Sequence, residues 1–155
     1  MQATHKRQMT FDIDTTVGYI VNRTAVLLRQ ALQQRFRQIH QSLTAEEWAL
    51  LGQLWKQDGL SRQVLAAKTF KDQTTVTRLL DALVTKGVVR RETDATDRRV
   101  IRIWLTDAGR QLESDLVPVA RGMIQDAVRN ISEADLQITL QTLRQIQANL
   151  LSSTE

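Results

Sequence analysis

Apolar side chains near the start of the chain recur every three or four positions, as on one face of an α-helix. The recurrence begins at about Asp14 and includes Val17, Ile20 and Leu28. It predicts a first helix of about 25 residues, which is longer than a small domain usually needs. The apolar stripe of such a helix must pack against another element or another chain. Residues 1–10 are polar and show no period, which predicts a mobile arm or a short helical extension.

Polar capping residues mark the starts of the later helices. Thr44 and Glu47 have capping-box spacing, in which each side chain can accept a hydrogen bond from a free backbone N–H. Further candidate N-caps are Ser61, Asp72, Thr106 and Ser132. Gly59 and Gly87 follow helical segments and can adopt the left-handed conformation that ends a helix. Pro118, the only proline, falls inside the helix that follows Thr106 and predicts a kink there.

The period of the pattern changes after Gly87. Residues 88–91 form a short run with strand character, residues 93–97 are polar and rich in turn formers, and residues 100–105 alternate between apolar and polar. This pattern predicts two strands joined by a polar loop. The predicted order is therefore helix, helix, helix-turn-helix, hairpin, helix, helix.

This order predicts a mainly α fold with a small β-hairpin wing. We expect residues 44–106 to form a winged helix-turn-helix DNA-binding domain. The terminal helices carry apolar stripes that so small a centre cannot cover. Residues 1–43 and 107–155 are therefore expected to form a helical dimerisation region in which two subunits pack together.

The positive charge of the chain is concentrated in one segment. The net charge is +4, but residues 60–110 hold 11 Lys and Arg against 6 Asp and Glu, while the rest holds 10 against 11. A basic segment beside a nearly neutral remainder is expected of a protein that binds a polyanion. The absence of cysteine excludes disulfides, cysteine zinc sites and thiol redox sensing. No apolar run could span a bilayer and no signal peptide is evident, so we expect a cytoplasmic protein.

The segment from Ser61 to Lys86 has helix-turn-helix proportions, in which the second helix lies in the major groove and reads bases with its N-terminal residues. Here those residues are Gln73, Thr74, Thr75, Thr77 and Arg78. Glutamine can pair with adenine and arginine with guanine. In the predicted hairpin, Arg98 and Arg99 follow a turn and suit insertion into the minor groove, with Asp97 placed to orient one guanidinium.

These segments resemble the MarR family of bacterial regulators. The wing-like run is Asp97-Arg98-Arg99 followed by Ile101, Ile103, Leu105, Thr106 and Gly109, and the helix-like run covers residues 75–83 and 86–89. The resemblance implies a homodimer that binds a pseudo-palindromic operator in double-stranded DNA and usually represses transcription. It implies that Arg78 reaches the major groove, that Arg98 or Arg99 reaches the minor groove, and that Asp97 positions the wing.

The resemblance also implies release from DNA by a small phenolic or amphipathic effector bound between the dimer helices and the DNA-binding lobe. Candidate ligand contacts are Tyr19, Arg23, Trp48 and Trp55, from the first helix and the helix that begins after Thr44. The alternative is that Trp48 and Trp55 pack in the core, which is the commoner role of aromatics at this spacing.

Two other classes of function compete with DNA binding. The only histidines are His5 and His40, and the sequence has no cysteine nucleophile, no Gly-rich phosphate loop and no metal-ligand spacing, so we predict no enzymatic activity, metal or cofactor. The second alternative is a winged-helix adaptor that binds protein instead of DNA. The arginines of the wing and the polar start of the recognition helix argue against it.

Overall fold

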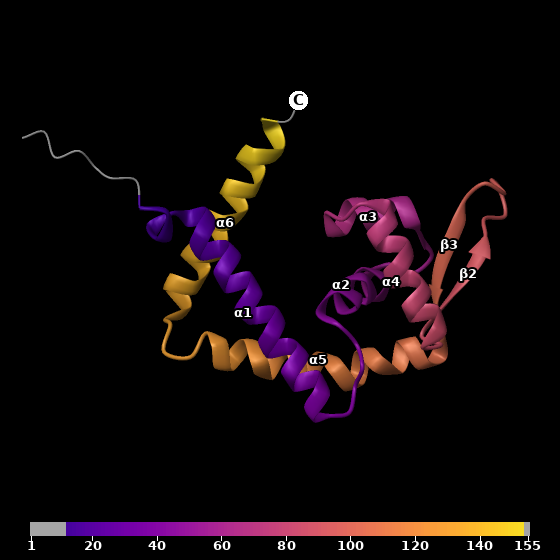
Figure 1. The fold of residues 1–155 in the computed structure, drawn as a ribbon, viewed down its shortest axis with the longest axis horizontal. Helices are drawn as coiled ribbons and strands as arrows, with labels where there is room; N and C mark the ends of the chain where they lie inside the picture. The colour runs from indigo at the N-terminus through magenta and orange to yellow at the C-terminus, as the bar shows by residue number, and fades with distance from the viewer. Residues whose placement is uncertain (1–11, 154–155) are drawn as a thin grey trace, which may run out of the picture.

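The computed structural model describes residues 12–153 and is mainly helical with one small sheet (Figure 1). In chain order the elements are the 3₁₀ helix η1 (Ile13–Thr15), α1 (Val17–Gln38), α2 (Ala45–Lys56), β1 (Leu60–Ser61), α3 (Arg62–Thr69), α4 (Gln73–Thr85), β2 (Val89–Thr93), β3 (Ile101–Leu105), α5 (Asp107–Ala127) and α6 (Glu133–Ser152). This order confirms the predicted fold class, a winged helix-turn-helix with long flanking helices. Residues 1–10, including His5, for which the sequence predicts a mobile arm or a short helical extension, lie outside the described residues.

The predicted caps begin the helices because each side chain replaces a missing backbone partner. Thr44 and Glu47 form the full capping box, with the Thr44 N–H donating to the Glu47 carboxylate at 2.8 Å and the Glu47 N–H donating to the Thr44 hydroxyl at 3.1 Å. Ser61, Asp72, Thr106 and Ser132 accept in the same way from α3, α4, α5 and α6. The first helix differs from its prediction, because Thr16 is extended and acts as its cap, which leaves residues 13–15 as a separate 3₁₀ turn.

The sheet has three antiparallel strands in the order β1-β3-β2, so the predicted two-stranded hairpin was incomplete. Strands β2 and β3 pair from Val89 opposite Leu105 to Thr93 opposite Ile101. The added strand is only two residues long, and Leu60 pairs with Ile103. Because β1 leads directly into α3, this pairing ties the base of the wing to the start of the helix-turn-helix.

One cluster of buried side chains joins the central elements to the flanking helices. We call α2, α3, α4 and the three strands the winged lobe. Its core continues into Leu32 and Phe36 of α1 and into Leu116 and Met123 of α5. Burial of this apolar surface therefore fixes the lobe on α1 and α5. Gly59 (φ +72°) makes the turn into β1 and lies so close to the Trp104 ring that a Cβ there would be 2.5 Å from it.

Helix α6 is packed very differently from the lobe. None of its residues is buried, and its exposed apolar residues include Ile138, Leu140 and Leu151. Figure 1 shows α6 extending away from α5 and apart from the winged lobe. In the part of the chain that the structure describes, no helix is both long enough and apolar enough to cross a membrane.

Candidate nucleic-acid interface

Helix α4 has one buried face and one polar outer face. The buried face consists of Val76, Leu79, Leu80 and Leu83. At its start, the Asp72 carboxylate accepts hydrogen bonds from the Thr75 N–H at 2.8 Å and from the Thr75 hydroxyl at 2.7 Å. The bond from the Thr75 N–H, and then that from its hydroxyl, hold the pKa of Asp72 below its ordinary value. The core thus fixes which face of α4 is turned outward.

The five predicted base-reading residues of α4 differ in their solvent exposure and in their hydrogen bonds within the protein. Gln73, Thr74 and Arg78 are exposed, whereas Thr75 and Thr77 are half-buried. The Thr75 hydroxyl donates to Asp72, and the Thr77 hydroxyl donates to the Gln73 carbonyl at 2.8 Å. Among the described residues, Arg78 has no side-chain hydrogen bond or ion pair. Its guanidinium is therefore available to an external acceptor.

The wing loop is organised around the carboxylate of Asp94. It accepts hydrogen bonds from the Thr96 N–H at 2.8 Å, the Thr96 hydroxyl at 2.6 Å and the Asp97 N–H at 3.0 Å. Arg102 donates to the same carboxylate and, at 2.9 Å, to the Gly59 carbonyl. The Thr96 hydroxyl and then Arg102 hold the pKa of Asp94 well below its ordinary value. These bonds connect the wing loop to the turn before β1.

The two adjacent arginines of the wing have different surroundings. Arg99 donates to the Asp97 carboxylate through Nε at 3.1 Å and Nη2 at 3.2 Å, although its side chain remains 91% exposed. This side-chain bond is the main reason that the pKa of Asp97 is lowered. Arg98 is exposed and has no such partner within the described residues. Asp97 therefore holds Arg99 and leaves Arg98 free.

The arginines of β2 are already paired inside the protein. Arg90 forms an ion pair with Glu92, and Arg91 donates to Asp81 of α4 at 2.6 Å. Arg102 is likewise paired with Asp94. Only part of the positive charge of the wing is therefore available to bind an external anion.

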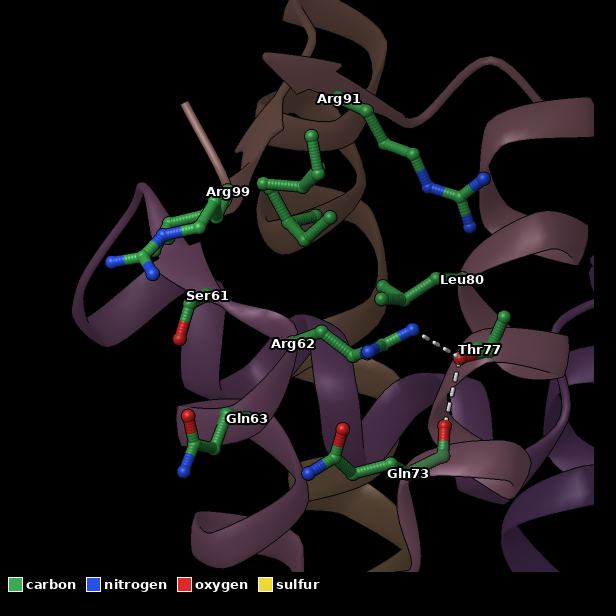
Figure 2. Close-up of a pocket in the computed structure, with 11 residues that line it drawn as sticks. Ser61, Arg62, Gln63, Gln73, Thr77, Leu80, Arg91 and Arg99 are labelled. Atoms are coloured by element: carbon green, nitrogen blue, oxygen red, sulfur yellow. Dashed lines mark hydrogen bonds between the residues drawn. The ribbon is translucent and has the colours of Figure 1, made fainter. Parts of the chain in front are cut away.

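Sequence reasoning missed Arg62, which lies beside the predicted base-reading residues. Arg62 begins α3, and its Nη1 donates to the Thr77 hydroxyl of α4 at 3.3 Å (Figure 2). Both residues line a groove of about 350 Å³ between the start of α3, α4 and the sheet. The sequence contains no local signal for this contact, because the two residues are brought together only by the turn of the helix-turn-helix.

A second groove, of about 530 Å³, lies between α1, α2 and α5. Its walls are mostly apolar and include Leu28, Trp48, Ala120 and Ile124, with Arg29 and Arg121 also among the lining residues. Two of these helices, α1 and α2, carry the residues predicted to contact an effector, and α5 supplies the remaining wall.

The four predicted ligand contacts do not gather at this groove. Only Trp48 lines it; its ring also packs edge-on against Trp55, with centroids 5.1 Å apart. The Trp55 indole N–H donates to the Gly109 carbonyl at 3.0 Å, joining α2 to α5. Arg23 donates to the Tyr19 hydroxyl at 3.4 Å on α1, and neither residue lines the groove. Across residues 12–153, no group of His, Cys, Asp and Glu side chains could hold a metal ion.

The fold and this polar surface define a winged helix-turn-helix protein, and comparison with known proteins identifies its family. The sequence profile of the MarR family matches residues 43–101. A MarR-family transcriptional regulator from Silicibacter pomeroyi is 31% identical, and the match covers 85% of this chain and 88% of that one with a TM-score of 0.70. The chain therefore belongs to the MarR family of transcriptional regulators.

Two further relatives show how far the similarity extends. The transcriptional regulator TtmR of Methylorubrum extorquens is 39% identical over 77 residues, which are 50% of this chain and 40% of TtmR, so the match spans less than half of that relative. The regulator BpsR of Bordetella bronchiseptica is 25% identical, with a TM-score of 0.81 over 89% of this chain and 97% of that one. The DNA binding of BpsR is regulated by 6-hydroxynicotinic acid.

Proposed function

We propose that this regulator is a homodimeric repressor that binds a pseudo-palindromic operator in double-stranded DNA, in the cytoplasm. The observation that carries the proposal is the position of Arg78 and Arg98, exposed on α4 and on the wing without an internal partner among the described residues. Arginines in these two elements suit the major and the minor groove respectively. Family membership and the regulated DNA binding of BpsR support the same function.

In the proposed complex, α4 reads bases in the major groove and the wing contacts the minor groove, as predicted from the sequence. Gln73, Thr74, Thr75, Thr77 and Arg78 would face the base edges in the major groove, with Arg78 the main reader. Arg98 would enter the minor groove because no described side chain pairs with it, whereas Arg99 is held by Asp97 and would contact the adjacent backbone. Asp97 would act on DNA only through Arg99 and the shape of the wing.

We assign the dimer interface to the terminal helices, within residues 1–43 and 107–155, and DNA reading to residues 44–106. The support is apolar surface left uncovered in one chain. Ile13, Val17 and Ile20 are each more than half exposed, and Ile138 of α6 is 62% exposed. Exposed apolar area of this kind marks an interface. A two-fold dimer would present two copies of α4 to half-sites about one helical turn apart.

The groove between α1, α2 and α5 is the proposed effector site. Its apolar walls and the two arginines that line it, Arg29 and Arg121, fit a small amphipathic or phenolic molecule. Trp48 would form one wall. A ligand there would act by changing how the winged lobe sits on α1 and α5, and thus the separation of the two recognition helices.

Selection of duplexes from a random pool tests the function directly. We expect the wild-type protein to recover a two-fold symmetric sequence and to sediment as a dimer at micromolar concentration. Placed across a promoter, that sequence should allow the protein to reduce transcription in vitro, and a screen of small aromatic acids should yield one that restores it. Recovery of no preferred duplex, or a stable folded monomer, would contradict the proposal.

A further inference from the structure

The groove beside α4 is lined by positive charge with no carboxylate among its lining residues. Arg62, Arg91 and Arg99 contribute from α3, β2 and the end of the wing loop, and Gln63 and Gln73 add amide groups. Figure 2 shows Arg62 reaching from the start of α3 toward Thr77 of α4. A groove of this composition suits an anion bearing several oxygen acceptors.

Arg62 is the member of this group whose charge is not neutralised by any residue that the structure describes. Arg91 is paired with Asp81, and Arg99 is paired with Asp97. Within residues 12–153 the Arg62 side chain has no carboxylate partner, and it donates a 3.3 Å hydrogen bond to the Thr77 hydroxyl. A guanidinium has five N–H donors, so most of those on Arg62 remain unused.

The position of Arg62 in its own helix also calls for an external anion. It is the first residue of α3, and the first turn of α3 contains no acidic residue. A positive charge at a helix N-terminus is unfavourable because it meets the positive end of the helix dipole. The local structure therefore does not stabilise the positive charge of Arg62. An anion bound in the groove would stabilise it.

We propose that Arg62 binds a phosphate of the DNA backbone and, through its bond to Thr77, positions the base-reading face of α4. The proposal rests on the DNA binding proposed above. When the second helix of a helix-turn-helix enters the major groove, the first crosses the backbone, which is where Arg62 lies. The planar guanidinium can hold a phosphate bidentately and keep its Nη1 on Thr77.

This arrangement makes Arg62 a link between backbone binding and base reading. The Thr77 hydroxyl accepts from Arg62 and donates to the Gln73 carbonyl at 2.8 Å. A phosphate on Arg62 would fix the guanidinium, and the guanidinium would fix the Thr77 hydroxyl. Arg62 is thus a positioning residue for Thr77 as well as a contact for the backbone.

The test compares Arg62→Ala and Arg62→Lys with Arg129→Ala, a control that removes the same charge from the exposed turn after α5. Affinity for a selected duplex and for a scrambled duplex is measured over a range of salt concentrations. Because the proposed dimer carries two copies of Arg62, we expect Arg62→Ala to weaken both by roughly tenfold and to lower the slope of log affinity against log salt by about 2. Arg62→Lys should keep the slope but lower the ratio of specific to scrambled affinity, because an ammonium group cannot replace the planar fork.

A second measurement identifies the phosphate itself. Single methylphosphonate substitutions, each of which removes one backbone charge, are placed along the selected duplex. One position in each half-site should, when substituted, weaken the wild-type protein and leave Arg62→Ala binding unchanged. If the wild type prefers no duplex, the proposed function fails. If the wild type binds its duplex but Arg62→Ala keeps both affinity and salt slope, or Arg129→Ala loses as much slope, the role of Arg62 is wrong and the function stands.

Discussion

The ammonium group of Lys86, at the end of α4, donates a 2.6 Å hydrogen bond to the carboxylate of Glu47 in the first turn of α2. The Glu47 side chain is only 4% exposed, and Lys86 also donates to the Ser42 carbonyl at 2.9 Å. The pair therefore fixes the end of the proposed recognition helix to the corner between α1 and α2. Ala45 and Trp48, beside Glu47 in the sequence, line the effector groove.

Replacing Lys86 with methionine should lower the free energy of unfolding, because it leaves the Glu47 carboxylate buried without its cation. Removing one partner of a fully buried pair costs about 3–5 kcal/mol. The cost here should fall below that range, because the Lys86 side chain is 27% exposed. The control is Lys56→Met, at an exposed lysine of α2 that should change stability by less than about 0.5 kcal/mol. Equal urea midpoints for the two variants would show that the pair contributes nothing.

The starts of the helices could be predicted from sequence because a cap is a local interaction. Thr44, Ser61 and Asp72 each bond a backbone N–H three residues ahead, within reach of any chain with that spacing. Strand β1 was missed, because two residues carry no period and pair only with a strand about forty positions later. The contacts of Lys86 with Glu47 and of Arg62 with Thr77 were missed for the same reason. Long-range packing decides which polar residues meet.

Arg78 should contribute to the preference of the protein for particular bases in the duplex. Substitution by alanine is expected to lower affinity for the selected duplex by about 1–3 kcal/mol and to relax selection at one or two base positions. The physical reason is that Arg78 is exposed and uncommitted to other described side chains, so its donors can pair with a guanine edge. Repeating the duplex selection with the variant checks this. An unchanged preferred sequence would remove Arg78 from the reading face.

The wing arginines should contribute affinity with less sequence preference. Arg98→Ala is expected to weaken binding to all duplexes, because the Arg98 side chain has no partner in residues 12–153 and its charge is available to DNA. Arg99→Ala should weaken binding and also release Asp97 from its main partner. Titration of the double variant against wild type measures the joint effect. Equal affinities would refute a role of the wing in binding.

The wing loop should hold its shape down to a pH near 3.8, the ordinary pKa of an aspartate, and open progressively at strongly acidic pH. The pKa of Asp94 is lowered from its ordinary value of 3.8, so its bonds stabilise the folded wing fully above that pH and are lost as the pH falls further. Amide exchange at Thr96 and Asp97, whose N–H groups donate to Asp94, reports the opening. Asp94→Ala, which leaves neither amide an acceptor at this position, should expose both amides already at neutral pH and weaken DNA binding. Equal protection in the variant would contradict this account.

The contact between α5 and the strand region should tolerate no side chain at Gly109. A Cβ built there would lie 2.0 Å from the Val88 carbonyl oxygen, which belongs to the backbone and cannot rotate away. Gly109→Ala should therefore push α5 from the sheet and disturb the bond from Trp55 to the Gly109 carbonyl. It should lower the free energy of unfolding by about 1–3 kcal/mol or more.

Gly122, in the same helix, has nothing within 4 Å of its Cβ position. Gly122→Ala should instead stabilise by up to about 1 kcal/mol, because alanine favours a helix interior. Thermal unfolding of the two variants separates these effects, and a Gly109→Ala protein as stable as wild type would show that α5 does not pack this closely on Val88.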